Sequence, residues 1–210
     1  NLSQLASDFY SYAIGPDGRP GVPLGSHSGP ETAGAVSEGG YLGFAELEYV
    51  HMPLRGEGLV AFLSDGAFEE QRGSDWSPRW WRAEDSGLVT PIMILNGRRI
   101  EERTEIAQDG GECWLDRHLR LNGFDPIPID GRDPAAVAWA ILEAEERLKR
   151  FTADPERHYP ARLPYVIART VKGFGFPGAG TNRAHNLPLE GNPRTDEAAR
   201  SIVTRTKAEF

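Results

Sequence analysis

The segments 58-GLVAFLSDG-66 and 88-LVTPIMILNG-97 decide the fold of this chain. Each is an apolar run typical of a buried parallel strand, and the stretch between them is typical of a helix. This pattern predicts a β-α-β unit in which Asp65 and Asn96 follow neighbouring strands. Open α/β sheets bind their ligands at the carboxyl ends of the strands. A carboxylate beside an amide oxygen at that edge suits Mg²⁺, which completes its coordination with water and substrate phosphates.

The rest of the chain indicates a single α/β domain over residues 1–210, with a mainly parallel central sheet flanked by helices on both faces. Glycine and proline recur through residues 15–34, which predicts a loop. Hydrophobic periodicity and end signals, including Gly123 as a helix stop, predict the other elements. We expect helices at 1–12, 38–51, 112–122 and 134–150, and strands at 124–129 and 163–171.

Composition narrows the class of protein. A chain of 210 residues with 39% hydrophobic content can bury one sizeable core. The net charge of −8, with both signs interspersed, argues against nucleic acid as a partner. No apolar run approaches the twenty or so residues that span a bilayer, so we expect no membrane partner and a cytoplasmic enzyme. The chain begins at Asn1 without a Met or a secretory signal pattern, which suggests part of something longer.

Three other features carry alternative interpretations. The single cysteine, Cys113, has no metal-ligand spacing around it and is predicted to be a small core residue. Tryptophans 76, 80 and 81 are predicted to pack, since a base-stacking platform needs basic neighbours. Gly39 and Gly40 begin the helix predicted at 38–51, where glycines let a phosphate approach backbone N–H groups; a plain turn is the alternative.

Several blocks of the sequence together resemble the amino-terminal domain of phosphoketolases, which are thiamine-diphosphate enzymes. The resemblance covers roughly residues 22–190, and the blocks occur in the family's order. They are 26-SHSGPETAG-34, 38-EGGYLG-43, 64-SDG-66, 91-PIMILNG-97, 170-TVKGF-174 and 185-HNLPL-189.

The resemblance implies a thiamine-diphosphate-binding fold, of which this chain is the diphosphate-binding domain. Asp65 and Asn96 would bind Mg²⁺ through side-chain oxygens, and the carbonyl of Arg98 would add a third protein ligand. The N–H groups of Gly66 and Ala67 would meet the diphosphate, as would the Gly39 and Gly40 segment. The implied activity is that of a lyase of carbohydrate and pentose phosphate metabolism. It cleaves a ketose phosphate with inorganic phosphate to acetyl phosphate, an aldose phosphate and water.

Three basic side chains match family positions that face the cofactor and the sugar phosphate. Lys172 would follow the last strand and bind cofactor or substrate, and His185 would lie in the Gly/Pro-rich segment 175–189 that follows. His27 would donate hydrogen bonds to substrate hydroxyls or transfer protons, work that suits a group titrating near neutrality. The resemblance thus makes these three residues catalytic candidates.

The same resemblance implies partners outside the chain. Enzymes of this type build each active site between a diphosphate-binding domain and a pyrimidine-binding domain, often across a homodimer interface. The Glu that activates the cofactor would belong to that other domain, so we assign this role to none of Glu31, Glu38, Glu69 or Glu70.

Departures from the family pattern leave the reaction open. Ser64 stands where the family has Gly, Ser37 where it has His, and Arg98 where it has an aromatic residue. The segment between Lys172 and His185 is also shorter. A transketolase-like transfer or a sugar-phosphate epimerisation is therefore an alternative, as is a non-catalytic binding module.

Overall fold

The computed structural model describes residues 59–70, 81–84, 87–185 and 189–209. Their strands form one four-stranded sheet in the order β1-β2-β4-β3, and every pairing is parallel, as predicted. The strands are β1 (Leu59–Ser64), β2 (Val89–Leu95), β3 (Phe124–Asp130) and β4 (Leu163–Arg169). The helices are α3 (Asp65–Glu70), α4 (Glu105–Gln108), α5 (Glu112–Leu121), α6 (Pro134–Ala153), η3 (Asn182–His185) and α7 (Glu197–Glu209).

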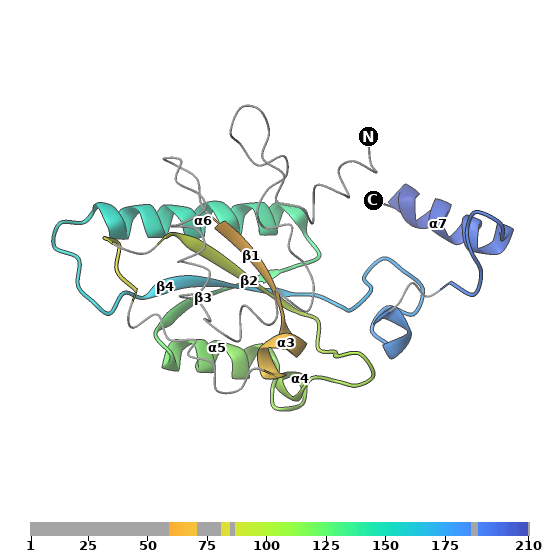
Figure 1. Ribbon diagram of the computed structural model, residues 1–210, viewed down its shortest axis with the longest axis horizontal. Coiled ribbons are helices and arrows are strands. Elements are labelled where there is room, and N and C mark those ends of the chain that lie inside the picture. The colour runs from red at the N-terminus through yellow and green to blue at the C-terminus, as the bar shows by residue number, and fades with distance from the viewer. Residues whose placement is uncertain (1–58, 71–80, 85–86, 186–188, 210) are drawn as a thin grey trace.

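Helices cover both faces of this sheet, which confirms the predicted architecture (Figure 1). On one face, α6 buries Ala140 and Ala144 against Ile92 and Val166 of the central strands. On the other face, α3, α4 and α5 pack against the remaining strand side chains through a larger core cluster. The central strands β2 and β4 therefore lie between two apolar layers, which is why they are nearly continuous hydrophobic runs.

Local signals in the sequence fix where the longest helix begins. Asp133 is the N-cap of α6, and its carboxylate accepts a hydrogen bond from the N–H of Ala135 at 2.9 Å. Pro134 follows in the first turn, where a missing N–H costs nothing. The helix therefore starts where the sequence predicts and runs to Ala153, three residues further than expected.

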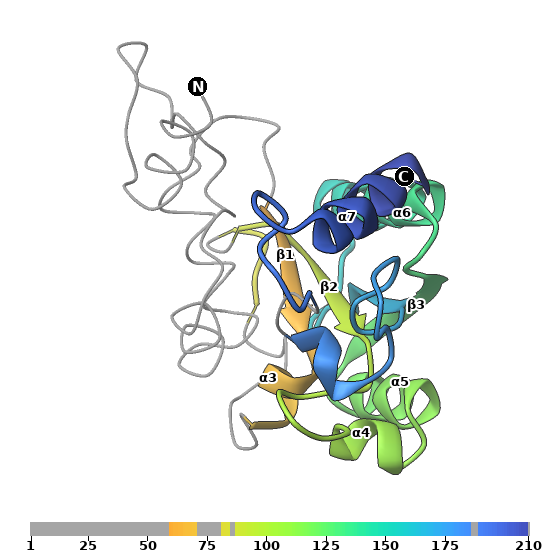
Figure 2. The same cartoon turned by 90° about the vertical axis from the view of Figure 1, so that its right-hand side faces the viewer.

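The parallel register brings four strand ends to one edge of the sheet (Figure 2). Ser64 pairs with Ile94, and Leu95 pairs with Arg169. Just beyond the strands, the N–H of Thr170 donates to the Leu95 carbonyl at 3.1 Å. The segments that carry Asp65, Asn96 and Lys172 consequently leave the sheet side by side.

One prediction is wrong: Cys113 is exposed and not a core residue. The buried face of α5 carries Leu115 and Leu119, which are four residues apart and both 0% exposed. Cys113 lies two residues before Leu115, about 200° around the helix axis, and so faces away from the core.

Some predictions fall outside the described residues, namely the helices at 1–12 and 38–51, the loop at 15–34, and Trp76 and Trp80. Trp81 is described and packs as expected: its ring is 0% exposed, and its indole N–H donates to the Gly87 carbonyl at 2.9 Å.

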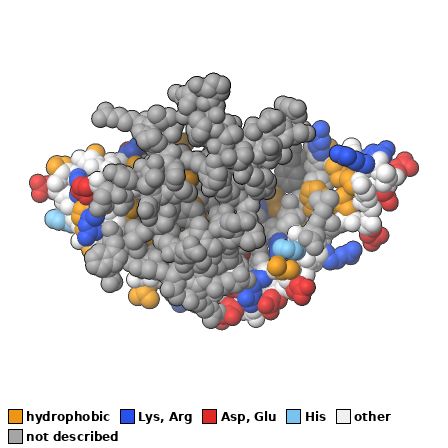
Figure 3. Space-filling model, in the orientation of Figure 1, with side chains coloured by type: hydrophobic (Ala, Val, Ile, Leu, Met, Phe, Trp, Pro, Cys, Tyr) orange, Lys and Arg blue, Asp and Glu red, His pale blue; other side chains and the backbone are white. Residues whose placement is uncertain are grey.

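The surface agrees with the interspersed charge of the sequence. Over the described part of the face in Figure 3, Lys and Arg side chains alternate with Asp and Glu side chains. The helices among the described residues include none that is both long enough and apolar enough to cross a bilayer.

Candidate functional site

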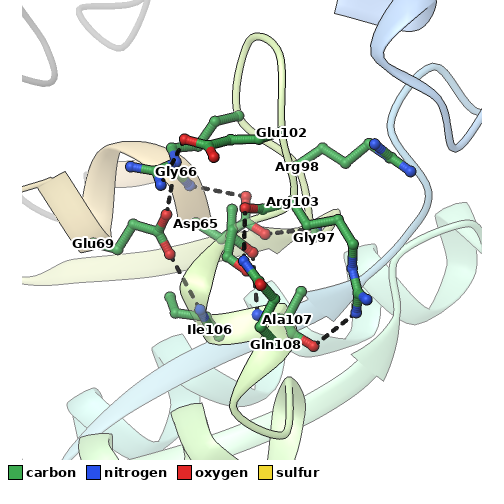
Figure 4. Close-up of polar contacts among 12 residues, drawn as sticks. Asp65, Gly66, Glu69, Gly97, Arg98, Glu102, Arg103, Ile106, Ala107 and Gln108 are labelled. Carbon is green, nitrogen blue, oxygen red and sulfur yellow. Dashed lines mark hydrogen bonds and ion pairs between the residues drawn. The ribbon is translucent and has the colours of Figure 1, made fainter.

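Asp65 lies at the junction of β1 and α3 and joins the ends of two strands. Its side chain is fully buried, at 0% exposure. Oδ2 accepts a hydrogen bond from the N–H of Gly97 at 2.6 Å, and Oδ1 accepts one from the N–H of Gly66 at 3.0 Å (Figure 4). The expectation that Asp65 lies beside the Asn96-Gly97 turn is confirmed.

Burial disfavours the ionised form of this carboxylate and raises the pKa of Asp65 to about 6. The hydrogen bonds from Gly97 and Gly66 oppose that rise, and the nearby charge of Glu69 adds to it. No Lys or Arg of the described residues forms a salt bridge with Asp65. The site therefore holds a buried acceptor whose charge a bound cation would stabilise.

Asn96 is held by a tight turn immediately after β2. Its Oδ1 accepts a hydrogen bond from the N–H of Arg98 at 2.9 Å. Gly97 adopts a φ of +77°, a conformation that glycine accepts without strain. An amide oxygen with one hydrogen bond keeps a second lone pair, so Oδ1 can still coordinate a cation. The turn thus places a neutral oxygen ligand beside the carboxylate.

A buried ion pair holds the segment after this turn against α3. The Arg99 Nε lies 3.0 Å from Oε1 of Glu69, and the N–H of Ile106 donates to Oε2 of Glu69 at 3.1 Å. Arg99 also packs over Gly66, where an added Cβ would lie 3.1 Å from the Arg99 Cγ. Sequence reasoning missed this pair, since nothing in the spacing of Glu69 and Arg99 marks them as partners.

Lys172 reaches the same edge from the end of β4. Its Nζ donates a hydrogen bond to the carbonyl of Arg99. Partial burial lowers the pKa of Lys172, and the negative charge of Asp65 opposes that shift. The structure thus brings Lys172 into the electrostatic neighbourhood of Asp65, as the sequence predicts.

His185 is the last residue of η3 and is exposed. Gly173 and Ala184 pack so closely that an added Cβ on Gly173 would lie 2.5 Å from the Ala184 Cβ. Because of this contact, the segment folds back on itself, and Lys172 and His185 lie at its two ends.

The contacts predicted between the cofactor or substrate and the remaining site residues are not tested by the structure. Ala67 belongs to α3, and the N–H of Gly66 is engaged by Asp65. His27, Gly39 and Gly40 lie outside the described residues. Their proposed contacts with diphosphate or substrate stay predictions.

The donor set favours a hard cation. The described residues contain no group of three or more His, Cys, Asp or Glu side chains arranged for a metal ion. A cation here would depend on one carboxylate, neutral oxygens and further ligands from a bound molecule. Mg²⁺ accepts that arrangement, whereas a structural Zn²⁺ site needs four protein ligands.

Sequence comparison assigns relatives to this chain. Residues 17–206 match the family model described as the XFP N-terminal domain. A probable phosphoketolase of Streptomyces coelicolor is 34% identical over 187 residues, which cover 80% of this chain and 23% of the relative. The xylulose-5-phosphate phosphoketolase of Lactiplantibacillus pentosus is 28% identical over 198 residues, or 86% of this chain and 25% of the relative. The chain spans about a quarter of the length of these relatives.

Comparison with solved structures identifies the fold. A transketolase mutant from Pichia stipitis superposes with a TM-score of 0.53 at 20% identity, over 90% of this chain and 26% of the transketolase. A second transketolase structure from the same organism, in complex with xylulose 5-phosphate, gives a TM-score of 0.51 at 19% identity. The predicted thiamine-diphosphate-binding fold is confirmed.

Proposed function

Since the chain belongs to the phosphoketolase family as its N-terminal domain, we propose that residues 1–210 form the diphosphate-binding domain of a thiamine-diphosphate- and Mg²⁺-dependent phosphoketolase. The proposed activity is a carbon–carbon lyase reaction, that of an aldehyde-lyase. Xylulose 5-phosphate or fructose 6-phosphate reacts with inorganic phosphate to give acetyl phosphate, a shorter aldose phosphate and water.

One observation carries the proposal: the Asp65 carboxylate is buried at the carboxyl end of β1 with backbone N–H groups as its hydrogen-bond donors. Burying a charge is costly unless a partner compensates it. The neighbouring Asn96 amide and Arg98 carbonyl would supply neutral oxygens, and the diphosphate would supply charged ones. This donor set fits Mg²⁺ bound together with a diphosphate.

In this proposal the residues of the chain bind the cation and the cofactor and orient the substrate. Thiamine diphosphate, when bound, supplies the electron sink for breaking the carbon–carbon bond. Asp65 and Asn96 hold the cation, and Lys172 places a positive charge near the phosphate oxygens. His185 and His27 donate hydrogen bonds to substrate hydroxyls or move a proton at a ring nitrogen.

The proposal includes partners beyond this chain. A pyrimidine-binding domain, from the same polypeptide or another subunit of a homodimer, would complete the site. The curated relatives are about four times as long as the matched segment, which supports a further domain. We propose a cytoplasmic location, where sugar phosphates are available.

A product assay tests the activity. The full-length protein is incubated with xylulose 5-phosphate, inorganic phosphate, Mg²⁺ and thiamine diphosphate, and acetyl phosphate is measured together with the ketose pool. Acetyl phosphate that depends on added phosphate supports a phosphoketolase. A rearranged ketose without acetyl phosphate would instead indicate an epimerisation, and products that require an aldose acceptor a transketolase-like transfer.

A further inference from the structure

Two loops that leave adjacent strands are tied together at the candidate site. We define the β2 loop as residues 96–104 and the β4 loop as residues 170–185. The β2 loop carries Asn96, and the β4 loop carries Lys172 and His185. Because β2 and β4 are neighbours in the sheet, the two loops emerge beside each other.

The Asn182 side chain contacts the β2 loop at two points. Its Oδ1 accepts a hydrogen bond from an Arg98 Nη1 at 2.6 Å, and its Nδ2 donates to the Glu101 carbonyl. An amide that accepts at one end and donates at the other has a single favourable orientation. Since Asn182 begins η3, this contact fixes the short helix that ends at His185.

The opposite end of the β4 loop is tied as well. Lys172 donates its hydrogen bond to the Arg99 carbonyl, next to Arg98 in the chain. Within the β4 loop, the N–H of Gly180 donates to the Lys172 carbonyl at 2.8 Å, and Gly173 packs on Ala184. The β4 loop is thus internally braced and attached to the β2 loop at both ends.

Arg98 links this attachment to the cation site. Its backbone N–H donates to the Asn96 Oδ1, and its side chain extends away from Asp65 (Figure 4) to reach Asn182. A cation that binds the Asn96 Oδ1 would therefore change the hydrogen bond that this oxygen accepts from Arg98, the residue whose side chain holds Asn182 and η3.

We propose that Arg98 and Asn182 are positioning residues, which hold His185 in place and transmit occupancy of the Asp65–Asn96 site to the β4 loop. The identity of the ligand rests on the proposed function, but the attachment of the two loops does not. Neither side chain needs to touch substrate for this role.

Hydrogen exchange on the full-length protein tests the inference. Amide exchange in residues 173–185 is measured for the wild type, Arg98→Ala and Asn182→Ala, each with and without Mg²⁺ and thiamine diphosphate. Without ligand, Arg98→Ala should exchange this segment roughly three to ten times faster than the wild type, which is the effect of losing one modest hydrogen bond. Asn182→Ala loses two hydrogen bonds and should exchange at least as fast as Arg98→Ala. With ligand, the wild type should gain protection in the segment, whereas Asn182→Ala, which leaves every proposed ligand of the cation in place, should bind without that gain. An equal gain of protection in Asn182→Ala would overturn the coupling between the site and the β4 loop.

Two further variants separate positioning from general destabilisation. Asn182→Asp keeps an acceptor for Arg98 but loses the donor to the Glu101 carbonyl, so it should exchange more slowly than Asn182→Ala and faster than the wild type. Arg103→Ala is the matched control, because Arg103 lies in the β2 loop but donates to the Ala107 carbonyl. It should leave residues 173–185 unchanged. Wild-type rates in ligand-free Arg98→Ala and Asn182→Ala would overturn the inference, as would exchange in Asn182→Asp that is as fast as in Asn182→Ala. Absence of binding by the wild type would contradict only the proposed function.

Discussion

Glu69 and Arg99 form an ion pair beneath the candidate site, with Oε1 and Nε 3.0 Å apart. The Glu69 side chain is 3% exposed and the Arg99 side chain 25%. Glu69 lies one helical turn after Asp65 in α3, so the two carboxylates share one helix face. Arg99 neutralises Glu69 and at the same time fastens the β2 loop to α3.

We expect Arg99→Met to destabilise the protein by about 3 kcal/mol, because it leaves a buried carboxylate without its partner. Denaturant unfolding measures the change. The double variant with Glu69→Leu should regain part of that loss, since both charges are then removed and only the acceptor for the Ile106 N–H is missing. A double variant less stable than Arg99→Met would contradict this account of the pair.

Cation binding should depend on pH through Asp65. Burial raises the pKa of Asp65 from 3.8 to about 6, so in the ligand-free fold the carboxylate is protonated below that value. Mg²⁺ requires the ionised form, and its binding must release the proton. Mg²⁺-dependent affinity for thiamine diphosphate should therefore be constant well above pH 6 and fall by up to about tenfold per unit below it. Calorimetric Kd values at pH 5, 6, 7 and 8 test this; a flat profile would exclude Asp65 as the titrating ligand.

Gly97→Ala should weaken cofactor binding as well as stability. The φ of +77° strains any other residue, and the new Cβ would lie 3.3 Å from the Ala107 Cβ. We expect a loss of about 1–2 kcal/mol in unfolding free energy and a displaced Asn96. Gly111→Ala is the control: its φ is +60° with no atom near the added Cβ, and it lies outside the site. It should lose stability but bind the cofactor normally, and equal effects of both variants on binding would refute the local explanation.

Removing a hydroxyl group from the core at Tyr165 should raise the stability of the protein. Tyr165 is 0% exposed, and its hydroxyl has no hydrogen-bond partner within the described part of the chain. Tyr165→Phe should raise stability by about 1 kcal/mol, because it removes a desolvated polar group and keeps the edge contact with the Phe124 ring. Tyr159→Phe should lower stability by a similar amount, since the Tyr159 hydroxyl accepts from the Ala83 N–H and donates to Glu84. Thermal unfolding that ranks the two variants the other way would contradict the assignment.

Strong local patterns explain what the sequence could predict. The apolar runs before Asp65 and Asn96 made the parallel strands recognisable, and the strand-end rule then placed the two residues together. The helix α7 was missed, although Asp196 accepts from the N–H of Ala199 at 2.8 Å in the manner of an N-cap. Its modest apolar periodicity hid that signal.

Contacts between distant residues could not be predicted in the same way. The Glu69–Arg99 pair and the Arg98–Asn182 hydrogen bond join residues 30 and 84 positions apart. Charged and amide side chains are common on surfaces, and no periodicity relates these partners. The exposure of Cys113 depends on which face of α5 packs against the sheet, and the buried Leu115 and Leu119 determine that face.

Asp65 is the residue that we propose anchors a cation–diphosphate complex. Isothermal calorimetry on the full-length protein would titrate thiamine diphosphate into the wild type, once with Mg²⁺ and once with a chelator. The same titrations would follow for Asp65→Ala and for Asp130→Ala, a control aspartate at the end of β3 that pairs with Arg132. We predict Mg²⁺-dependent binding in the wild type and in Asp130→Ala, and none in folded Asp65→Ala. Unchanged affinity in Asp65→Ala, or no binding by the folded wild type, would contradict the claim.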